Sequence, residues 1–118
     1  MTAHKGSCHC GNVKFEVELN LQEAMACNCS ICLRKGTLFS FVSADKFKLK
    51  SGNENLTDYQ FGKKSIHHTF CSTCGVTAFV SGKMPDGSPV MAINVRCLEE
   101  VEIEKLVIKN FDGKAINI

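Results

Sequence analysis

Three short cysteine clusters constrain this chain more than any other feature of its sequence. Seven of its eight cysteines fall in the segments C-H-C-G (8–11), C-N-C-S-I-C (27–32) and C-S-T-C-G (71–75). Spacings this short place thiolates a few ångströms apart on one turn, which suits a tetrahedral metal ion. The outer clusters supply two thiolates each, which together predict a closed four-thiolate site. The middle cluster supplies three, which predicts a site with one open position.

We predict that a structural zinc ion is held by the four thiolates of the outer clusters, Cys8, Cys10, Cys71 and Cys74. Each of the two turns ends in glycine, which permits the positive φ that tight ligand-bearing turns often use. Each turn also precedes a predicted strand. Zinc in this position would tie the N-terminal strand to the centre of the fold and contribute folding free energy directly.

The middle cluster predicts a second, catalytic-type zinc site with the ligands Cys27, Cys29 and Cys32. Three thiolates over-neutralise the dication, so zinc here is a poor activator of water. Its open position can instead hold a fourth sulfur as a thiolate near neutral pH. Such a thiolate remains nucleophilic and can add to an aldehyde carbonyl, giving a hemithioacetal. We expect Arg34, Lys35 and the backbone amides that follow Ser30 to offset the negative charge.

Other side chains offer ways to close this second site. Cys97, His67 or His68 could supply the fourth ligand and make the site structural. Alternatively, Cys97 is a small buried hydrophobe that alternates with Val95 and Ile93 along a strand, as is common for a lone cysteine. His68 is a candidate proton carrier or an ordinary strand histidine. The sequence leaves these alternatives open.

The cysteines favour metal over disulfides. A bridge between Cys8 and Cys10, or between Cys27 and Cys29, would close a strained ring across one residue. The first seven residues, M-T-A-H-K-G-S, contain no apolar signal-peptide core. No apolar run approaches the roughly 18 residues that a membrane helix needs. We therefore expect a cytoplasmic protein with no membrane partner, in a compartment where thiols stay reduced.

Length and charge narrow the function further. The chain has 118 residues, which predicts one zinc-binding domain over residues 1–118. Its net charge is only +2 and no block of lysine or arginine is present, so nucleic acid is not indicated as a partner.

Alternating apolar residues predict a mainly β fold. In residues 12–19, Val13, Phe15, Val17 and Leu19 alternate with polar residues, as in a half-buried strand. Further strands are expected at 37–42, 47–50, 56–61, 66–70, 76–80, 90–95, 107–111 and 115–118. One helical turn is expected at residues 30–35, with Ser30 as its cap. The residues before Cys8 are expected to lack regular structure.

Turn-forming residues suggest how these strands connect. The pair 56–61 and 66–70 is expected to form a hairpin around residues 62–64, and G-K-M-P-D-G-S-P joins 76–80 to 90–95. Asp112 and Gly113 indicate a third hairpin, between 107–111 and 115–118.

The order of the cysteine motifs, with basic residues after C-N-C-S-I-C and with F-C-S-T-C-G downstream, resembles the glutathione-dependent formaldehyde-activating enzyme family. The same domain occurs in centromere protein V. The resemblance implies a β-tent of several small coiled antiparallel sheets around zinc. It also implies a structural zinc on Cys8, Cys10, Cys71 and Cys74, and a catalytic zinc on Cys27, Cys29 and Cys32. The implied reaction makes S-(hydroxymethyl)glutathione from glutathione and formaldehyde.

Two hypotheses follow from the motifs and the resemblance. The first is a zinc-dependent carbon–sulfur lyase-type enzyme that carries two zinc ions and acts on a glutathione-like thiol adduct of a small aldehyde. The second is a non-catalytic, zinc-stapled β-domain that binds a protein partner. An open coordination position at the middle cluster favours the first. The sequence does not indicate an oligomeric state.

Overall fold

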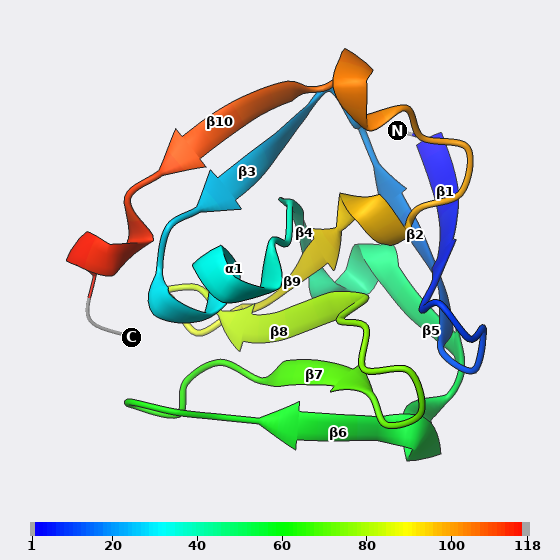
Figure 1. Cartoon of the computed structure of the whole chain (residues 1–118), viewed down its shortest axis with the longest axis horizontal. Coiled ribbons are helices and arrows are strands. Elements are labelled where there is room, and N and C mark those ends of the chain that lie inside the picture. The colour runs from blue at the N-terminus through cyan, green and yellow to red at the C-terminus, as the bar shows by residue number, and fades with distance from the viewer. Residues whose placement is uncertain (1, 117–118) are drawn as a thin grey trace.

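Over residues 2–116, which the structure describes, the chain forms three small β-sheets and one short helix, α1 (Ser30–Lys35) (Figure 1). The structure is a computed structural model. The first sheet has the order β1 (Thr2–Ser7), β2 (Lys14–Leu19) and β5 (Phe47–Ser51). The second has the order β10 (Val107–Phe111), β3 (Glu23–Cys27), β4 (Phe39–Ser43), β9 (Pro89–Asn94) and β8 (Phe79–Lys83). The third pairs β6 (Leu56–Tyr59) with β7 (His68–Cys71).

Short 3-10 turns connect several of these elements, at Ala44–Lys46, Asn53–Asn55, Val95–Cys97, Ile103–Lys105 and Gly113–Ala115. The predicted fold class, a mainly β protein of small antiparallel sheets, is confirmed. The described residues contain no helix that is long and apolar enough to cross a membrane.

An aromatic cluster lies where the first and second sheets meet. Alternation along β2 buries Phe15, Val17 and Leu19, as predicted. The ring of Phe15 lies 5.5 Å from that of Phe47 and 5.8 Å from that of Phe79, between centroids. This is the range that aromatic pairs prefer, and it joins β2, β5 and β8 in one core.

The five-stranded sheet has two apolar faces, which positions the site. Ala24 on β3 and Ile93 on β9 turn toward the main core. Their strand neighbours Met25 and Ala92 turn to the other face, because successive side chains point to opposite sides of a strand. Phe41 is directly opposite Ala92 and shares this second face. The second face forms the wall of a cleft described below.

Two predicted hairpins are confirmed, but the second begins later than expected. β6 pairs with β7 and β8 pairs with β9, both antiparallel. The strand expected at 76–80 begins at Phe79, because the preceding backbone has other partners. The carbonyl of Val76 accepts from the N–H of Cys71 at 3.0 Å, and those of Thr77 and Ala78 accept from Asn94 at 2.8 and 3.0 Å.

The hairpin expected at the C-terminus is wrong. β10 pairs in parallel with β3, which lies about 84 residues earlier and was not expected to be a strand. Gly113–Ala115 is a 3-10 turn where a returning strand was expected, and residues 117–118 of that expected strand lie outside the described residues. The turn crosses the cysteine loop, and the N–H of Lys114 donates to the Asn28 side chain there at 3.0 Å.

Three local expectations also need correction. Thr2–Ser7 forms β1 along the full length of β2, where no regular structure was expected. The cap of α1 is Cys29, whose carbonyl accepts from the N–H of Leu33 at 3.0 Å, while Ser30 is the first helical residue. Cys97 lies in the 3-10 turn after β9 and not in the strand itself.

Candidate metal centres and active site

The four outer cysteines converge on one point, although Cys10 and Cys71 are 61 residues apart. The sulfur atoms of Cys8, Cys10, Cys71 and Cys74 all lie within 4.8 Å of one another. The Sγ of Cys10 is 3.6 Å from that of Cys8 and 3.6 Å from that of Cys71. Four sulfurs about 2.3 Å from a central zinc would be separated by about 3.8 Å. The arrangement therefore fits a tetrahedral thiolate site.

The two turns that carry this first group are built alike. The N–H of Cys8 donates to the carbonyl of Val13 at 3.0 Å, and the N–H of Cys71 donates to that of Val76 at 3.0 Å. The glycines that end the two motifs have φ of 84° and 79°, as expected from their place in the sequence. Each turn thereby directs two thiols toward the other turn.

Hydrogen-bond donors surround these sulfur atoms. The N–H of Val13 donates to the Sγ of Cys8 at 3.3 Å, and the Nδ2 of Asn55 donates to that of Cys71 at 3.2 Å. The N–H groups of Cys10 and Val76 lower the pKa of Cys74 to about 6. Donors of this kind stabilise the thiolate form, which is the form that binds a metal ion.

The three middle cysteines form a second group of sulfurs within 4.8 Å of one another: Cys27, Cys29 and Cys32. Cys27 ends β3, Cys29 caps α1 and Cys32 lies in the first turn of α1. The N–H of Cys29 donates to the Sγ of Cys27 at 3.4 Å. The helical turn is therefore what folds the loop back, so that three thiols share one place.

The pKa shifts of these thiols explain why a cation would stabilise the group. Burial, followed by the neighbouring Cys29 and Cys27, raises the pKa of Cys32 to about 12. Burial also raises the pKa of Cys29, but the N–H groups of Cys32 and Ile31 and the adjacent thiols outweigh it, so the net direction is down. Three thiols this close resist ionising together unless a positive ion neutralises them. The donor set therefore fits a divalent metal that prefers sulfur.

A buried hydroxyl lies beside this group. The Oγ1 of Thr37 has no hydrogen-bond partner among the described residues, and Thr37 is only 6% exposed. It lies near enough to Cys32 to lower the pKa of that thiol, although burial outweighs this effect. A thiolate at Cys32 would give this hydroxyl the acceptor that it lacks.

The C-terminal segment holds the second group in place, which the sequence did not indicate. The N–H of Asn28 donates to the carbonyl of Phe111 at 3.2 Å, and its Nδ2 donates to the Asp112 carboxylate at 2.9 Å. Gly113 packs so closely against the Sγ of Cys27 that a Cβ at this position would overlap it. The Asp112-Gly113 pair was the only signal in the sequence, and it was interpreted as a hairpin turn.

The second group opens into a cleft of about 470 Å³. The three thiols and His68 line it, and the second face of the five-stranded sheet forms much of its wall. Most of the other lining side chains are apolar: Met25, Phe39, Phe41, Ile66, Val80, Met84, Val90, Ala92, Phe111 and Ile116. This meeting could not be read from the sequence, because most of these residues come from the five strands of one sheet and the others, Ile66, Met84 and Ile116, from the connecting and C-terminal segments.

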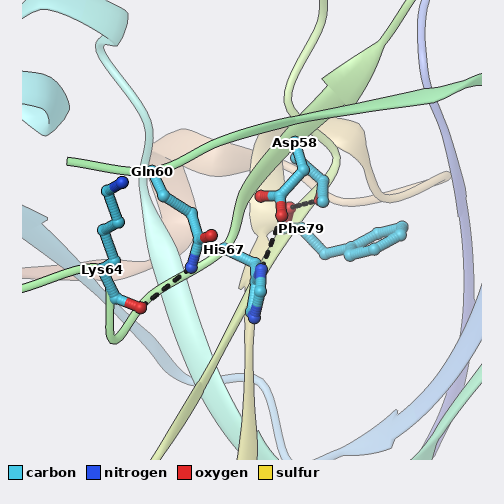
Figure 2. Close-up of polar contacts among 6 residues, drawn as sticks. Asp58, Gln60, Lys64, His67 and Phe79 are labelled. Atoms are coloured by element: carbon cyan, nitrogen blue, oxygen red, sulfur yellow. Dashed lines mark hydrogen bonds and ion pairs between the residues drawn. The ribbon is translucent and has the colours of Figure 1, made fainter.

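The two histidines considered as ligands occupy different places. His67 bonds to the Asp58 carboxylate at 2.7 Å (Figure 2). His68 is buried in the cleft wall, with its ring stacked 5.2 Å from that of Phe61. Burial, followed by the charge of Lys35, lowers the pKa of His68, so the ring is neutral at pH 7. Neither histidine belongs to the second thiol group as the described residues form it.

Cys97 also lies apart from the second group. Its Sγ is 3.8 Å from the carbonyl of Thr77, and it packs against the main core. Burial raises its pKa to about 11, with smaller contributions from Cys8 and Cys74 of the first group. The structure therefore places Cys97 near the first group, as a partly buried hydrophobe, and does not bring it to the middle cluster.

The two basic residues after the middle cluster have separate roles. The Nζ of Lys35 donates to the Thr77 hydroxyl at 2.6 Å and lies 5.3 Å from the ring centroid of Phe70. Burial lowers the pKa of Lys35, and the thiolate of Cys32 opposes this. Arg34 donates to the carbonyl of Ser30 at 2.9 Å. Of the two, Lys35 is the one whose charge acts on the second group.

Comparisons with known proteins identify the family of this chain. A family model described as glutathione-dependent formaldehyde-activating enzyme matches residues 3–111. A crystal structure of a protein from Rhodobacter sphaeroides is similar to this chain, with a TM-score of 0.77 and 34% sequence identity. That similarity covers 89% of this chain and 99% of the Rhodobacter chain.

Proposed function

Because this chain belongs to the glutathione-dependent formaldehyde-activating enzyme family, we propose that it is a zinc enzyme that joins a thiol to a small aldehyde. The reaction is of the carbon–sulfur lyase type and gives a hemithioacetal. We assign a structural zinc to the first cysteine group and a catalytic zinc to the second, Cys27, Cys29 and Cys32. Glutathione and formaldehyde, which the family's description names, are the first pair to assay.

One observation carries the proposal: three thiols meet at the edge of a cleft and leave room for a fourth ligand from outside the chain. Of the other candidates for the fourth position, Cys97 packs near the first group and His67 is bonded to Asp58. Among residues 2–116, His68 lines the same cleft but does not belong to the group of three sulfurs. A closed group of four, such as the first one, has no such room. The donor count of the second group therefore favours chemistry over a purely structural role.

The chain's own residues have three roles in this proposal. The three thiols hold the metal, which when bound supplies a site where a substrate thiol loses its proton near neutral pH. His68, neutral in the wall of the same cleft, accepts that proton on a ring nitrogen and returns it to the oxygen that was the aldehyde carbonyl. Lys35 offsets the negative charge near Cys32.

Cobalt substitution tests the open position. We expect the absorption of the cobalt protein to shift when glutathione is added, because a site with three sulfurs becomes one with four. Formaldehyde should then be consumed faster than in the uncatalysed reaction, and Cys32→Ser should abolish both effects. Cys97→Ser is the matched control and should change neither. A cobalt protein that responds to no small thiol would favour the alternative, a non-catalytic domain that binds a protein partner.

A further inference from the structure

We infer, on the basis of the function proposed above, that one of the two reactants carries an apolar group, which lies in the cleft beside the second cysteine group. The enzyme would then prefer an apolar thiol or an apolar aldehyde to the pair glutathione and formaldehyde. The inference depends on the chemistry of the cleft wall, on its size and on its continuity with the three thiols.

The wall is apolar because of the way the strands alternate. Val80, Ala92 and Phe39 form a small buried cluster at the base of the cleft, with Cys32 packed against it. Phe41 and Met84 line the same cleft, and each remains 50% exposed. An apolar group placed here would contact the cluster and cover these two side chains, which removes apolar surface from water. Because Cys32 is part of the same surface, the group would remain next to the reacting sulfur.

The volume of the cleft exceeds what formaldehyde needs. A cleft of about 470 Å³ is within the usual range for a small-molecule site, about 300–1,000 Å³. Formaldehyde has two heavy atoms, and at about 30 Å³ for an atom of the size of a water molecule it would occupy roughly 60 Å³. The remaining space must hold the rest of a reactant or remain filled with water against an apolar wall. An attached carbon chain suits it better than water.

Glutathione is a poor occupant of that space. It carries two carboxylates, one ammonium group and two peptide bonds, all of which need partners once they leave water. Among residues 2–116, the polar side chains that line the cleft, apart from the three thiols, are those of His68, Ser81 and Lys83. Lys83 is exposed, and Lys35 is already bonded to Thr77. One exposed lysine cannot satisfy two carboxylates, so polar groups of glutathione placed in the cleft would remain unpaired.

The proposed step balances without another reagent. The S–H bond of the thiol breaks and a carbon–sulfur bond forms at the aldehyde carbon. The electron pair of the carbonyl bond moves to oxygen, which takes up the proton that the thiol released. The apolar group can belong to the thiol or to the aldehyde, because both reacting atoms meet at the edge of the same cleft.

Three methionines allow the cleft to be tested by NMR without any turnover. Met25 and Met84 line the cleft, whereas Met91 faces the main core and serves as an internal control. In the zinc-loaded protein with ¹³C-labelled methionine methyls, hexan-1-ol should shift the signals of Met25 and Met84 and leave that of Met91 unchanged. S-methylglutathione, which has no free thiol, should shift none of them. The inference is overturned if hexan-1-ol moves neither cleft signal up to its solubility limit, or if S-methylglutathione moves them more.

The same spectra distinguish a second copy of the chain as the occupant. If two copies covered each other's clefts, the Met84 signal would change with protein concentration and hexan-1-ol would have no effect at high concentration. That result would also overturn the inference. A Met84 signal that depends on hexan-1-ol and not on protein concentration supports it.

Kinetics then identify which reactant carries the apolar group. Hexanethiol with formaldehyde and glutathione with hexanal are compared with glutathione and formaldehyde, and at least one hexyl pair should have the higher kcat/KM. Phe41→Ser should raise the KM for that hexyl reactant roughly fivefold, since it removes about half of a phenylalanine contact. Val107→Ser, at a position that is 57% exposed and outside the cleft, should leave that KM unchanged.

Efficient turnover of glutathione and formaldehyde alone would refute the inference and leave the proposed function intact. Binding of hexan-1-ol without any turnover would refute the proposed function and leave the apolar ligand class intact.

Discussion

Gly113 is the residue on which the shape of the second cysteine group depends most directly. A Cβ at this position would overlap the Sγ of Cys27 and lie 3.2 Å from the Cβ of Cys29. The neighbour is the sulfur of a candidate metal ligand at the end of β3, so it cannot move aside without leaving the group. We expect Gly113→Ala to reduce the zinc content from two ions per chain to one while the far-UV circular dichroism stays unchanged.

Gly82→Ala is the matched control for this prediction. A Cβ on Gly82 would meet its nearest neighbour, the side chain of Ile66, at 3.7 Å, which is ordinary van der Waals contact. Its zinc content should equal that of the parent protein. Two zinc ions in Gly113→Ala would show that the loop tolerates the crowding and that the close approach has no role in the site.

His68 should titrate below its ordinary pKa of 6.5, because burial and the charge of Lys35 both disfavour its protonated form. Lys35→Met removes the charge and keeps an apolar contact with Phe70, so it should raise the pKa of His68 part of the way toward 6.5. Arg34→Met, on the same helix, should leave the pKa of His68 unchanged. An NMR titration of the ring protons measures each value, and an unchanged pKa in Lys35→Met would contradict the assignment.

The lowered pKa of His68 also makes the stability of the fold depend on pH, in a direction that follows from the shift. Between the lowered pKa of the folded state and 6.5, the unfolded chain binds more protons at His68 than the folded chain does. The stabilisation of the folded state by neutral His68 is therefore fully present above pH 6.5 and is lost as the pH falls through this window. We expect the stability of His68→Gln relative to the parent to improve on acidification from pH 7.5 to 5.5, as measured by chemical denaturation. The comparison with the parent removes the contribution of metal loss, which both proteins share.

Strands with a clear local signal in their own sequence were predictable, whereas β1 and β3 carry no such signal and were missed. β2 shows apolar alternation, and β6 and β7 form a hairpin around turn residues, so local signals sufficed for them. β3 has the sequence E-A-M-A-C, which is rich in residues that are uncommon in strands. It becomes a strand because β4 and β10 pair with it on either side. Pairing across so long a separation has no local signature.

The candidate site likewise has parts that local sequence predicts and parts that it does not. Cys27, Cys29 and Cys32 lie within one loop, so their spacing alone indicated that they meet. The outer group was predictable because its two turns carry complementary motifs. The apolar wall was not, since residues such as Phe41 and Val90 resemble ordinary core or surface residues until the sheet places them in the same cleft as the thiols.

The segment after β10 crosses the cysteine loop and is held there by hydrogen bonds to the side chain of Asn28. The side chain of Asn28 donates to Asp112 at 2.9 Å and accepts from the N–H of Lys114 at 3.0 Å. We expect Asn28→Ala to lower the free energy of unfolding by about 1–2 kcal/mol, the usual value for two hydrogen bonds that are partly exposed. Hydrogen exchange should show faster loss of the Lys114 amide proton.

Asp86→Ala is the control for the Asn28→Ala prediction. Asp86 accepts a hydrogen bond from the N–H of Ser88 at 2.9 Å, in the exposed loop between β8 and β9, away from both cysteine groups. Its loss should leave exchange at Lys114 and the zinc content unchanged. If Asn28→Ala also left the exchange at Lys114 unchanged, the side chain of Asn28 would have no role in holding the C-terminal segment.

In the whole molecule, the two cysteine groups differ in what they connect. The first joins the start of β2 to the turn between β7 and β8, so it ties the first sheet to the rest of the fold. The second lies within residues 27–32, from the end of β3 to the first turn of α1, and so joins no distant segments. Metal binding at the first group should therefore contribute to global stability, whereas binding at the second should contribute mainly to function.

Replacing one buried cysteine in each group tests this division. Cys71 is 1% exposed and Cys29 is 6% exposed, so a serine at either position removes one sulfur from a similarly buried place. We expect Cys71→Ser to lower the melting temperature by more than about 10 °C, because about 3 kcal/mol or more of metal-linked folding energy is lost. Cys29→Ser should lower it by only a few degrees and remove one zinc ion. Equal losses in the two melts would mean that both groups hold the fold together and that the second is not reserved for chemistry.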